Sequence, residues 1–178
     1  MRTASIIQKK DIPVLGINTG RLGFLADISS NDFSLLLQDL LIGRYRVEER
    51  SQLTLTTLNK SFDGYNYALN EVAVLKQDTA SMITIHVKIN KEYRTSYQAD
   101  GLIIATPTGS TAYSMSVGGP IMTPDTSSFI LSPIAPHSLT ARPLVVPDTS
   151  IISLNIESRN CNYLVSLDGR SDILPSDT

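Results

Sequence analysis

From about residue 45 onward the apolar residues follow a period of two, and this pattern constrains the fold more than any other feature of the sequence. The clearest case is ITIHVKI at residues 83–89, where Ile or Val alternates with Thr, His and Lys. Such alternation is typical of a strand with one buried face, and Asn90-Lys91 would then turn the chain into a second strand. Further strands are expected over residues 102–105, 128–131, 151–156 and 163–167. Short strands at regular spacing predict a mainly β, sandwich-like domain.

Residues 53–76 are predicted to form a hairpin within this domain. Leu53, Leu55 and Leu58 indicate its first strand, and Asp63-Gly64 is a dipeptide typical of tight hairpin turns. The second strand would run through YNYALNEVAVLK at residues 65–76. The β-rich domain is therefore expected to cover residues 45–178.

The first 44 residues follow a different pattern. IPVLGIN at residues 12–18 is continuously apolar, which is typical of a parallel strand buried on both faces. Parallel strands belong to sheets covered by helices, yet only one unit of that kind is present. We interpret residues 1–44 as the remnant of an α/β domain, one strand and one helix, and expect both ends of the sequence to be cut from a longer protein.

The helix of this remnant is predicted over residues 33–41, where Phe and Leu recur at helical spacing. Ser29, Ser30 and Asn31 are candidate N-caps, and Gly43 suits a left-handed position at the helix exit. The leucines of the helix are expected to form core.

Composition excludes several classes of protein. A net charge of -2 argues against a large nucleic-acid interface, which needs a basic face. No apolar run approaches the roughly 18 residues of a membrane span, and the amino terminus lacks a secretory apolar core. Cys161 has no second cysteine to pair with, which fits a reducing compartment. These features predict a cytoplasmic protein that binds neither nucleic acid nor membrane.

The Asn70-Glu71 pair interrupts an otherwise apolar segment, YALNEVAVL at residues 67–75. Neighbouring side chains of a strand point to opposite faces, so both reach one ligand only if a bulge turns them to the same side. The glutamate would then accept hydrogen bonds from ribose hydroxyls, and the asparagine would read an adenine edge. The alternative is a solvent-facing strand edge.

Residues 100–120, DGLIIATPTGSTAYSMSVGGP, place a loop of Thr, Ser, Gly and Pro directly after a short apolar strand. Loops of this composition cost backbone entropy on folding, and they usually bring backbone and hydroxyl groups close to a ligand. Tyr113 would offer a flat stacking surface. Asp100 would hold sugar hydroxyls or a positively charged ring, or would simply form a turn with Gly101.

Other motifs are weak or absent. NTGRLGF at residues 18–24 places two glycines where open α/β sheets bind ligands, but a tight turn explains them equally well. The sequence contains no GxGxxG, no GxxxxGK followed by Ser or Thr, and no GxSxG. His137 is a conceivable base, although a lone histidine next to Pro136 is more often structural.

Four segments together resemble the ATP-dependent NAD kinases. They are NTGRLGFLAD, NEVAV, DGLIIATPTGSTAYSMSVGGPI and PIAPHSLTARPLVVPD, and they extend from residue 18 to residue 148. The third is long and unusual, which makes the resemblance specific. In that family the hydroxyl-rich loop encloses the adenosine half of NAD.

The resemblance implies a set of NAD-binding residues. Asn70 and Glu71 match the Asn-Glu pair of the family, and Asp100 matches its nucleotide-binding aspartate. The loop residues that would enclose NAD are Thr108, Thr111, Ala112, Tyr113, Ser114, Met115 and Ser116, and the pocket would be lined by Phe24 and Ala135. Gln98 and Arg170 stand where relatives can carry an arginine and a glutamine, which puts any phosphate contact from either in doubt.

The resemblance also implies the reaction, in which the γ-phosphate of ATP passes to the 2′-hydroxyl of the adenosine ribose of NAD with Mg²⁺, giving NADP. The family carries a GGDGT motif, whose aspartate activates that hydroxyl, upstream of a segment like RTAS at residues 2–5. The motif is absent from this sequence. No catalytic residue and no metal site is therefore assigned within it, and the chain alone is expected to be inactive.

NAD and ATP are the expected substrates, and a homo-oligomer, dimer or tetramer, is the expected assembly. Two alternatives come from other classes of function. One is a non-catalytic nucleotide-binding or oligomerisation module, and the other is a lipid or sugar kinase of the same superfamily. The polar Asn-Glu pair and the TPTGSTAYS segment favour NAD over a lipid, because they offer hydrogen-bonding groups rather than an apolar slot.

Overall fold

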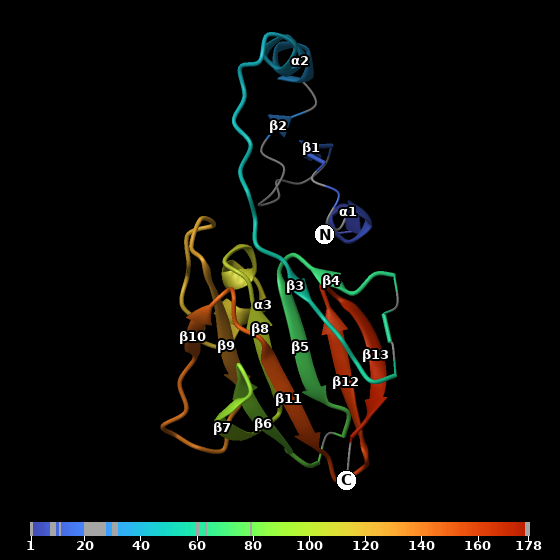
Figure 1. The fold of residues 1–178 in the computed structure, drawn as a ribbon, viewed down its shortest axis with the longest axis vertical. Coiled ribbons are helices and arrows are strands. Elements are labelled where there is room, and N and C mark those ends of the chain that lie inside the picture. The colour runs from blue at the N-terminus through green and yellow to red at the C-terminus, as the bar shows by residue number, and fades with distance from the viewer. Residues whose placement is uncertain are drawn as a thin grey trace. The chain divides into compact units, whose positions relative to one another are not determined.

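The computed structural model describes residues 2–7, 10, 12–19, 28–29, 32–59, 61–62, 64–78 and 80–176 (Figure 1). These residues divide into two compact units. Lys9–Glu49 form one, and Met1–Gln8 together with Arg50–Thr178 form the other, here called the sandwich unit. Phe24 lies outside the described residues, as does most of NTGRLGF, so what was predicted for them stays a prediction.

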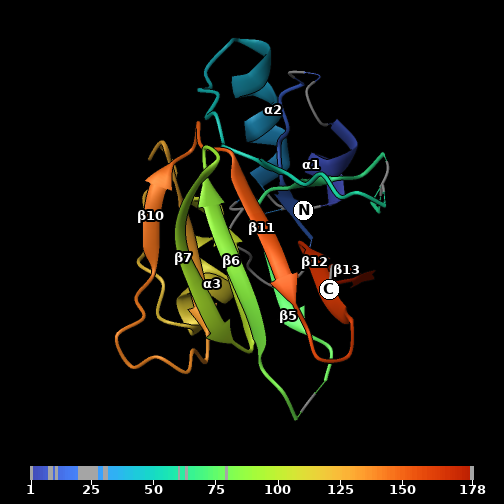
Figure 2. The same ribbon diagram turned by 60° about the horizontal axis from the view of Figure 1, so that its bottom comes forward.

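The sandwich unit is built on two antiparallel sheets. The larger has the strand order β10-β9-β8-β5-β12-β13, and the smaller has the order β11-β6-β7. Figure 2 shows the smaller sheet, with β6 between β7 and β11. The strands are β5 (Glu71–Lys76), β6 (Ile83–Ile89), β7 (Glu92–Ala99), β8 (Gly101–Ala105), β9 (Ser128–Ile134), β10 (Leu144–Pro147), β11 (Ile152–Glu157), β12 (Asn162–Leu167) and β13 (Arg170–Pro175).

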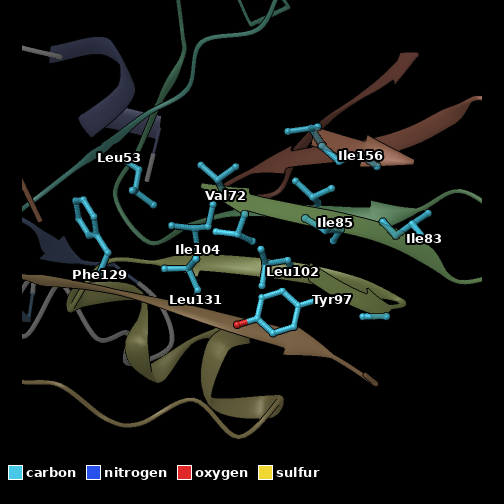
Figure 3. Packing of buried hydrophobic residues seen from close by; sticks show 14 of the residues in the cluster. Leu53, Val72, Ile83, Ile85, Tyr97, Leu102, Ile104, Phe129, Leu131 and Ile156 are labelled. Atoms are coloured by element: carbon cyan, nitrogen blue, oxygen red, sulfur yellow. The ribbon is translucent and has the colours of Figure 1, made fainter. Parts of the chain in front are cut away.

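The inward faces of both sheets meet in one apolar core, shown in Figure 3. In β6, Ile83, Ile85 and Val87 are at most 2% exposed, while the residues that alternate with them are half-buried or exposed. Leu102 and Leu131 of the larger sheet are fully buried in the same cluster. Each such side chain contributes about 1.5–3 kcal/mol by leaving water. The mainly β, sandwich-like fold predicted from the period of two is confirmed.

Two tight turns in this unit have a left-handed backbone. Asn90 and Lys91, with φ of 53° and 72°, connect β6 to β7 as predicted. Asp168 and Gly169, with φ of 45° and 80°, connect β12 to β13. Two successive residues of positive φ give the turn whose twist matches that of the flanking strands. The second turn was not predicted, although Asp-Gly is a strong hairpin signal.

The strands β10 and β13 were not predicted either. Both are edge strands of the larger sheet. In β10, Pro143 precedes the strand and Pro147 ends it, and a proline, which cannot donate to the ladder, argues against a strand when only the sequence is read. In β13, three consecutive residues are exposed, so the alternation that reveals a half-buried strand is missing. An edge strand packs on fewer neighbours, and its sequence is correspondingly less patterned.

The hairpin predicted over residues 53–76 is present in a reduced form. β3 (Leu53–Thr54) pairs antiparallel with β4 (Tyr67–Ala68), and Gly64 has a φ of 80° between them. Asp63 lies outside the described residues. Leu58, expected in the first strand, is 89% exposed in the long connection, and that prediction is wrong. The expected second strand is divided by a bend at Leu69-Asn70 into β4 and β5.

In the Lys9–Glu49 unit, β1 (Ile17–Asn18) pairs parallel with β2 (Ile28–Ser29). The parallel direction agrees with the prediction. The prediction that residues 12–18 are buried on both faces is wrong, because Ile12 and Val14 are 54% and 59% exposed. A parallel strand buries its faces only between neighbouring strands and covering helices. Within the described part of this unit, β2 is the only strand paired with β1.

The predicted helix is confirmed as α2 (Phe33–Leu41), and Gly43 has the expected left-handed φ of 73°. The N-cap is Asp32 rather than Ser29, whose hydroxyl donates to the Asp32 carboxylate at 2.8 Å; Ser30 and Asn31 lie outside the described residues. The leucines of α2 are not core in this structure. No residue of α2 is buried, and Leu41 is 80% exposed, because an amphipathic helix buries its stripe only against a partner surface.

Candidate functional site

The Asn70-Glu71 pair lies in a corner, Leu69 to Glu71, where the chain bends between β4 and β5. The main-chain N–H groups of this corner all donate to one side chain. Leu69 donates to Oδ2 of Asp168 at 2.8 Å, and Asn70 and Glu71 donate to its Oδ1 at 2.9 and 3.1 Å. This bend, rather than the bulge considered from the sequence, breaks the strand at the pair.

The carbonyl groups of the corner are satisfied as well. Thr106 donates its hydroxyl to Leu69 O at 2.5 Å and its N–H to Asn70 O at 2.9 Å. The N–H of Asp168 donates to Glu71 O at 3.2 Å. Two residues, Asp168 and Thr106, thus satisfy all six main-chain polar groups of the corner. No main-chain group of the corner therefore needs a hydrogen bond from the Asn70 or Glu71 side chain.

Those side chains each keep an oxygen without a partner. Oδ1 of Asn70 and Oε2 of Glu71 are buried and accept no hydrogen bond in the structure. An unpartnered buried acceptor costs about 1–3 kcal/mol, and folded proteins rarely leave one unpaired. Two of them on adjacent residues indicate a site that a ligand with hydroxyl or N–H groups would satisfy.

The carboxyl group of Glu71 has an unusual protonation equilibrium. Its pKa is raised from the ordinary value of 4.5 to about 7, mainly by burial and to a smaller extent by the negative charge of Asp168. Near neutral pH the group is therefore divided between a protonated form that can donate and an ionised form that only accepts. Perturbed carboxyl groups of this kind concentrate at functional sites.

The hydroxyl-rich loop is seated directly against this corner. A Cβ at residue 109 would collide with the main-chain carbonyl of Asn70, so only glycine allows the loop to approach so closely. Gly109 N donates to the Thr106 hydroxyl at 3.1 Å, and Met122 N donates to the Ser110 hydroxyl at 3.0 Å. The loop continues as a short 3-10 helix, Thr108–Thr111, and then α3 (Tyr113–Ser116), which lies beside β8 in Figure 1.

Most of the loop residues predicted to bind NAD are accessible beside the corner. Thr108, Thr111 and Ala112 are half-buried, and Tyr113, Met115 and Ser116 are exposed. Ser114 differs from the others. It is fully buried, and its hydroxyl lies 3.0 Å from the hydroxyl of Ser132, so in this structure it holds α3 to β9 rather than facing solvent.

Asp100, Gln98 and Ala135 form a second group at the opposite end of the same strands. The β5–β8 register pairs Glu71 with Ala105 and Leu75 with Gly101, which separates Asp100 from Glu71 by about 15 Å along the strands. Asp100 makes an ion pair with Lys76 at 2.7 Å. Gln98 and Ala135 are exposed, and Gln98 lines a groove of about 820 Å³ together with His137. The structure does not bring this group and the corner together within one copy of the sandwich unit.

The β12–β13 turn supplies two further residues. Asp168 was not predicted, although the Asp-Gly dipeptide after a strand was a signal that could have found it. Arg170, predicted as a possible NAD contact, donates from its guanidinium to Tyr65 O and Tyr67 O, both at 2.6 Å. It thereby holds the turn against β4.

The described residues contain neither a metal-binding cluster nor a membrane-spanning helix. Among the described residues, no group of three or more His, Cys, Asp or Glu could hold a metal ion. The described residues therefore offer no cluster that fits a Mg²⁺ site of their own. No helix of the described part of the chain has the length and apolar character needed to cross a membrane.

Comparison with known proteins places this geometry in context. The ATP-NAD kinase N-terminal domain matches residues 1–45, and the ATP-NAD kinase C-terminal domain matches residues 69–178. The NAD kinase of Porphyromonas gingivalis is 53% identical over 178 residues, which are 100% of this chain and 61% of the relative. The NAD kinase of Flavobacterium johnsoniae is 52% identical over 172 residues, 96% of this chain and 58% of the relative. The chain thus spans about three fifths of the curated relatives it matches.

Two solved structures are similar. Yeast NADH kinase in complex with NADH aligns over 93% of this chain and 48% of its own, with a TM-score of 0.82 and 32% identity. An NAD kinase from Archaeoglobus fulgidus in complex with ATP aligns over 92% of this chain and 62% of its own, with a TM-score of 0.76 and 32% identity. The resemblance found in the four sequence segments is confirmed, and the chain belongs to the ATP-NAD kinase family.

Proposed function

We propose that this chain provides the NAD-binding part of an NAD kinase, an enzyme that transfers the γ-phosphate of ATP to the 2′-hydroxyl of the adenosine ribose of NAD. The observation that carries the proposal is the pair of buried, unpartnered oxygens on Asn70 and Glu71. The main chain of Asn70 lies against a loop that could not approach so closely with any residue but glycine at position 109. Kinases of this family act on dinucleotides, whose ribose hydroxyls and adenine amine are the donors that these oxygens lack.

Each group has a distinct role in the proposed site. Glu71 accepts a hydrogen bond from a ribose hydroxyl through Oε2, and Asn70 accepts one from the adenine edge through Oδ1. Tyr113, a residue of α3 that is 41% exposed, stacks on the dinucleotide with its aromatic ring. The same ligand is enclosed by the other loop residues, Thr108, Thr111, Ala112, Met115 and Ser116. Ser114 contributes indirectly, because it fixes the position of α3.

Phosphoryl transfer also needs groups that this sequence does not contain. Catalysis of this kind depends on positioning and on charge neutralisation around the phosphates, with a residue or water that orients the nucleophile. The sequence has no GGDGT motif, and we assign the role of its aspartate to no residue of this chain. ATP and Mg²⁺ are thus proposed to engage mainly residues outside this sequence, and the 178-residue chain alone is proposed to be inactive.

The test is an assay of NADP formation with ATP, NAD and Mg²⁺. The chain alone should form no NADP, whereas a chimera carrying the amino-terminal part of the Porphyromonas gingivalis NAD kinase should form it. Glu71→Ala in the chimera should lower the rate, and Glu92→Ala, an exposed position on the smaller sheet, should not. NADP formation by the chain alone would show that catalysis does not need the absent motif.

The alternative of a non-catalytic nucleotide-binding module makes a different prediction in the same assay. Such a module would bind NAD, yet the chimera would form no NADP. The homo-oligomer and the cytoplasmic location expected from the sequence stay predictions. Sedimentation of the purified chain and fractionation of cells that express it would test them.

A further inference from the structure

Asp168 occupies an unusual position relative to the proposed site. It is 97 residues from Glu71 in sequence, at the turn between β12 and β13, and its φ of 45° lies in the left-handed region. With Gly169 at 80°, this backbone forms a two-residue turn. The carboxylate thereby lies over the beginning of β5 and accepts three N–H bonds of 2.8 to 3.1 Å.

The turn itself is held in place. Arg170 donates two hydrogen bonds of 2.6 Å to the carbonyls of Tyr65 and Tyr67, just before the corner, and the Asp168 N–H donates to Glu71 O. The turn is therefore hydrogen-bonded both to the chain just before the corner and to the last residue of the corner. A residue held this firmly fixes the position of what it binds.

The consequence concerns the side chains of Asn70 and Glu71. Asn and carboxylate side chains readily accept hydrogen bonds from nearby main-chain N–H groups. Without Asp168, three N–H groups of the corner would lack their acceptor. Two residues of the same corner carry unpartnered buried oxygens, Oδ1 of Asn70 and Oε2 of Glu71. These are the two oxygens that the proposed function assigns to the ligand.

We propose that Asp168 is a positioning residue of the nucleotide site, which satisfies the main-chain N–H groups of the corner and so keeps the Asn70 and Glu71 oxygens available for NAD. This inference rests on the proposed function. It assigns Asp168 no contact with the substrate. Asp168 also contributes the negative charge that acts on the Glu71 carboxyl group, which gives the proposal a readout that does not involve NAD.

The test compares Asp168→Ala and Asp168→Asn with Asn90→Ala in the 178-residue chain. Asn90 is a matched control because it also has a left-handed φ, 53°, in a two-residue turn, and its Oδ1 also accepts a main-chain N–H bond, from Ile151 at 2.9 Å. Both substitutions at position 168 should weaken NAD binding in calorimetry by tenfold or more. Asn90→Ala should leave NAD affinity unchanged while lowering the unfolding temperature to a similar extent.

Two measurements do not depend on NAD. Amide hydrogen exchange at residues 69–71 should accelerate at least tenfold in Asp168→Asn and remain slow in Asn90→Ala. The Glu71 carboxyl group, followed by NMR, should titrate at a lower pH in Asp168→Asn than in the unsubstituted chain. Asp168→Asn retains the side-chain size and an acceptor, so it serves if Asp168→Ala does not fold.

The outcomes separate the two proposals. If the unsubstituted chain binds no NAD, the proposed function fails, while exchange and titration still decide whether Asp168 fixes the corner. If the chain binds NAD and Asp168→Asn binds it equally well, the positioning role is overturned. Unchanged exchange at residues 69–71 in Asp168→Asn would overturn it independently.

Discussion

A carboxylate lies at each end of the β5–β8 strand pair, and the two differ in burial and in their partners. At one end, Asp100 is partly exposed and already paired with Lys76 at 2.7 Å. At the other, Glu71 is partly buried and keeps an unpartnered oxygen, while a different carboxylate, Asp168, satisfies the backbone around it. At the corner, the main-chain bonds are thus supplied by a residue distant in sequence, and the Glu71 oxygen is left without a partner. The proposed function assigns that oxygen to the ligand.

The largest expected effect comes from inserting a methyl group between the loop and the corner. Gly109→Ala places a Cβ against the Asn70 carbonyl and should destabilise the chain by about 1–3 kcal/mol, with loss of NAD binding. Gly101→Ala is the matched substitution at the Asp100 end, where a Cβ would collide with the Val74 carbonyl. Urea unfolding should show similar losses for both, and calorimetry should show the larger loss of NAD affinity in Gly109→Ala. Equal NAD affinities in the two variants would contradict the special position of the corner.

A second effect concerns the stacking surface beside the corner. Tyr113→Ala should weaken NAD binding by about 1–3 kcal/mol, by analogy with base–aromatic stacking. The free energy of unfolding of Tyr113→Ala should change by less than about 0.5 kcal/mol, because the residue is 41% exposed. Tyr113→Phe keeps the ring and should retain most of the affinity. A loss as large in Tyr113→Phe as in Tyr113→Ala would point to the hydroxyl instead of stacking.

The pH dependence of stability offers a third comparison. The pKa of Glu71 is raised from 4.5 to about 7, so between these values the folded chain binds more protons than the unfolded chain. Its contribution to the free energy of unfolding is complete below about pH 4.5 and is lost as the pH rises to about 7. Because the group is partly exposed, the change should be on the order of 1 kcal/mol. Urea unfolding at pH 5 and pH 7.5 should show this decrease, and Glu71→Gln should remove it.

The smallest effect is expected at the Asp100 end. Lys76→Ala removes a partly exposed ion pair and should cost no more than about 1 kcal/mol of stability, with NAD affinity unchanged. Asp100→Ala removes the same pair, and the family resemblance predicts that it also lowers NAD affinity. Calorimetry on both variants separates the ion pair from the ligand contact. If Asp100→Ala and Lys76→Ala bind NAD identically, Asp100 does not belong to the site.

The parts of the fold that could be predicted are those in which apolar and polar residues recur regularly, because one face packs on the core and the other faces solvent. β6 and its Asn90-Lys91 turn follow directly from such a pattern, and α2 follows from helical spacing. The edge strands β10 and β13 lack two-sided neighbours, so their sequences carry no such pattern. The exposure of Leu41 and Leu58 was equally hidden, because apolar spacing predicts what a segment can bury and says nothing of whether a partner surface is present.

The site shows the same division. Asn70, Glu71 and the hydroxyl-rich loop could be predicted, because unusual residue types stand out within apolar segments. Asp168 could not be connected to them, because it is 97 residues from Glu71 in sequence. Its contact with the corner depends on the register in which β12 pairs with β5. The distance between Asp100 and Glu71 is likewise a property of strand register, which one-dimensional spacing does not contain.

The central claim is that the corner of the sandwich unit, with its two unpartnered oxygens, is where NAD binds. Calorimetric titration of NAD into the unsubstituted chain, Glu71→Ala and Asn70→Ala tests it most directly. Glu71→Ala should lose about 1.5–3 kcal/mol of binding free energy and Asn70→Ala about 1 kcal/mol, as expected for removing a charge-assisted and a neutral hydrogen bond. Unchanged NAD affinity in both variants would contradict the claim.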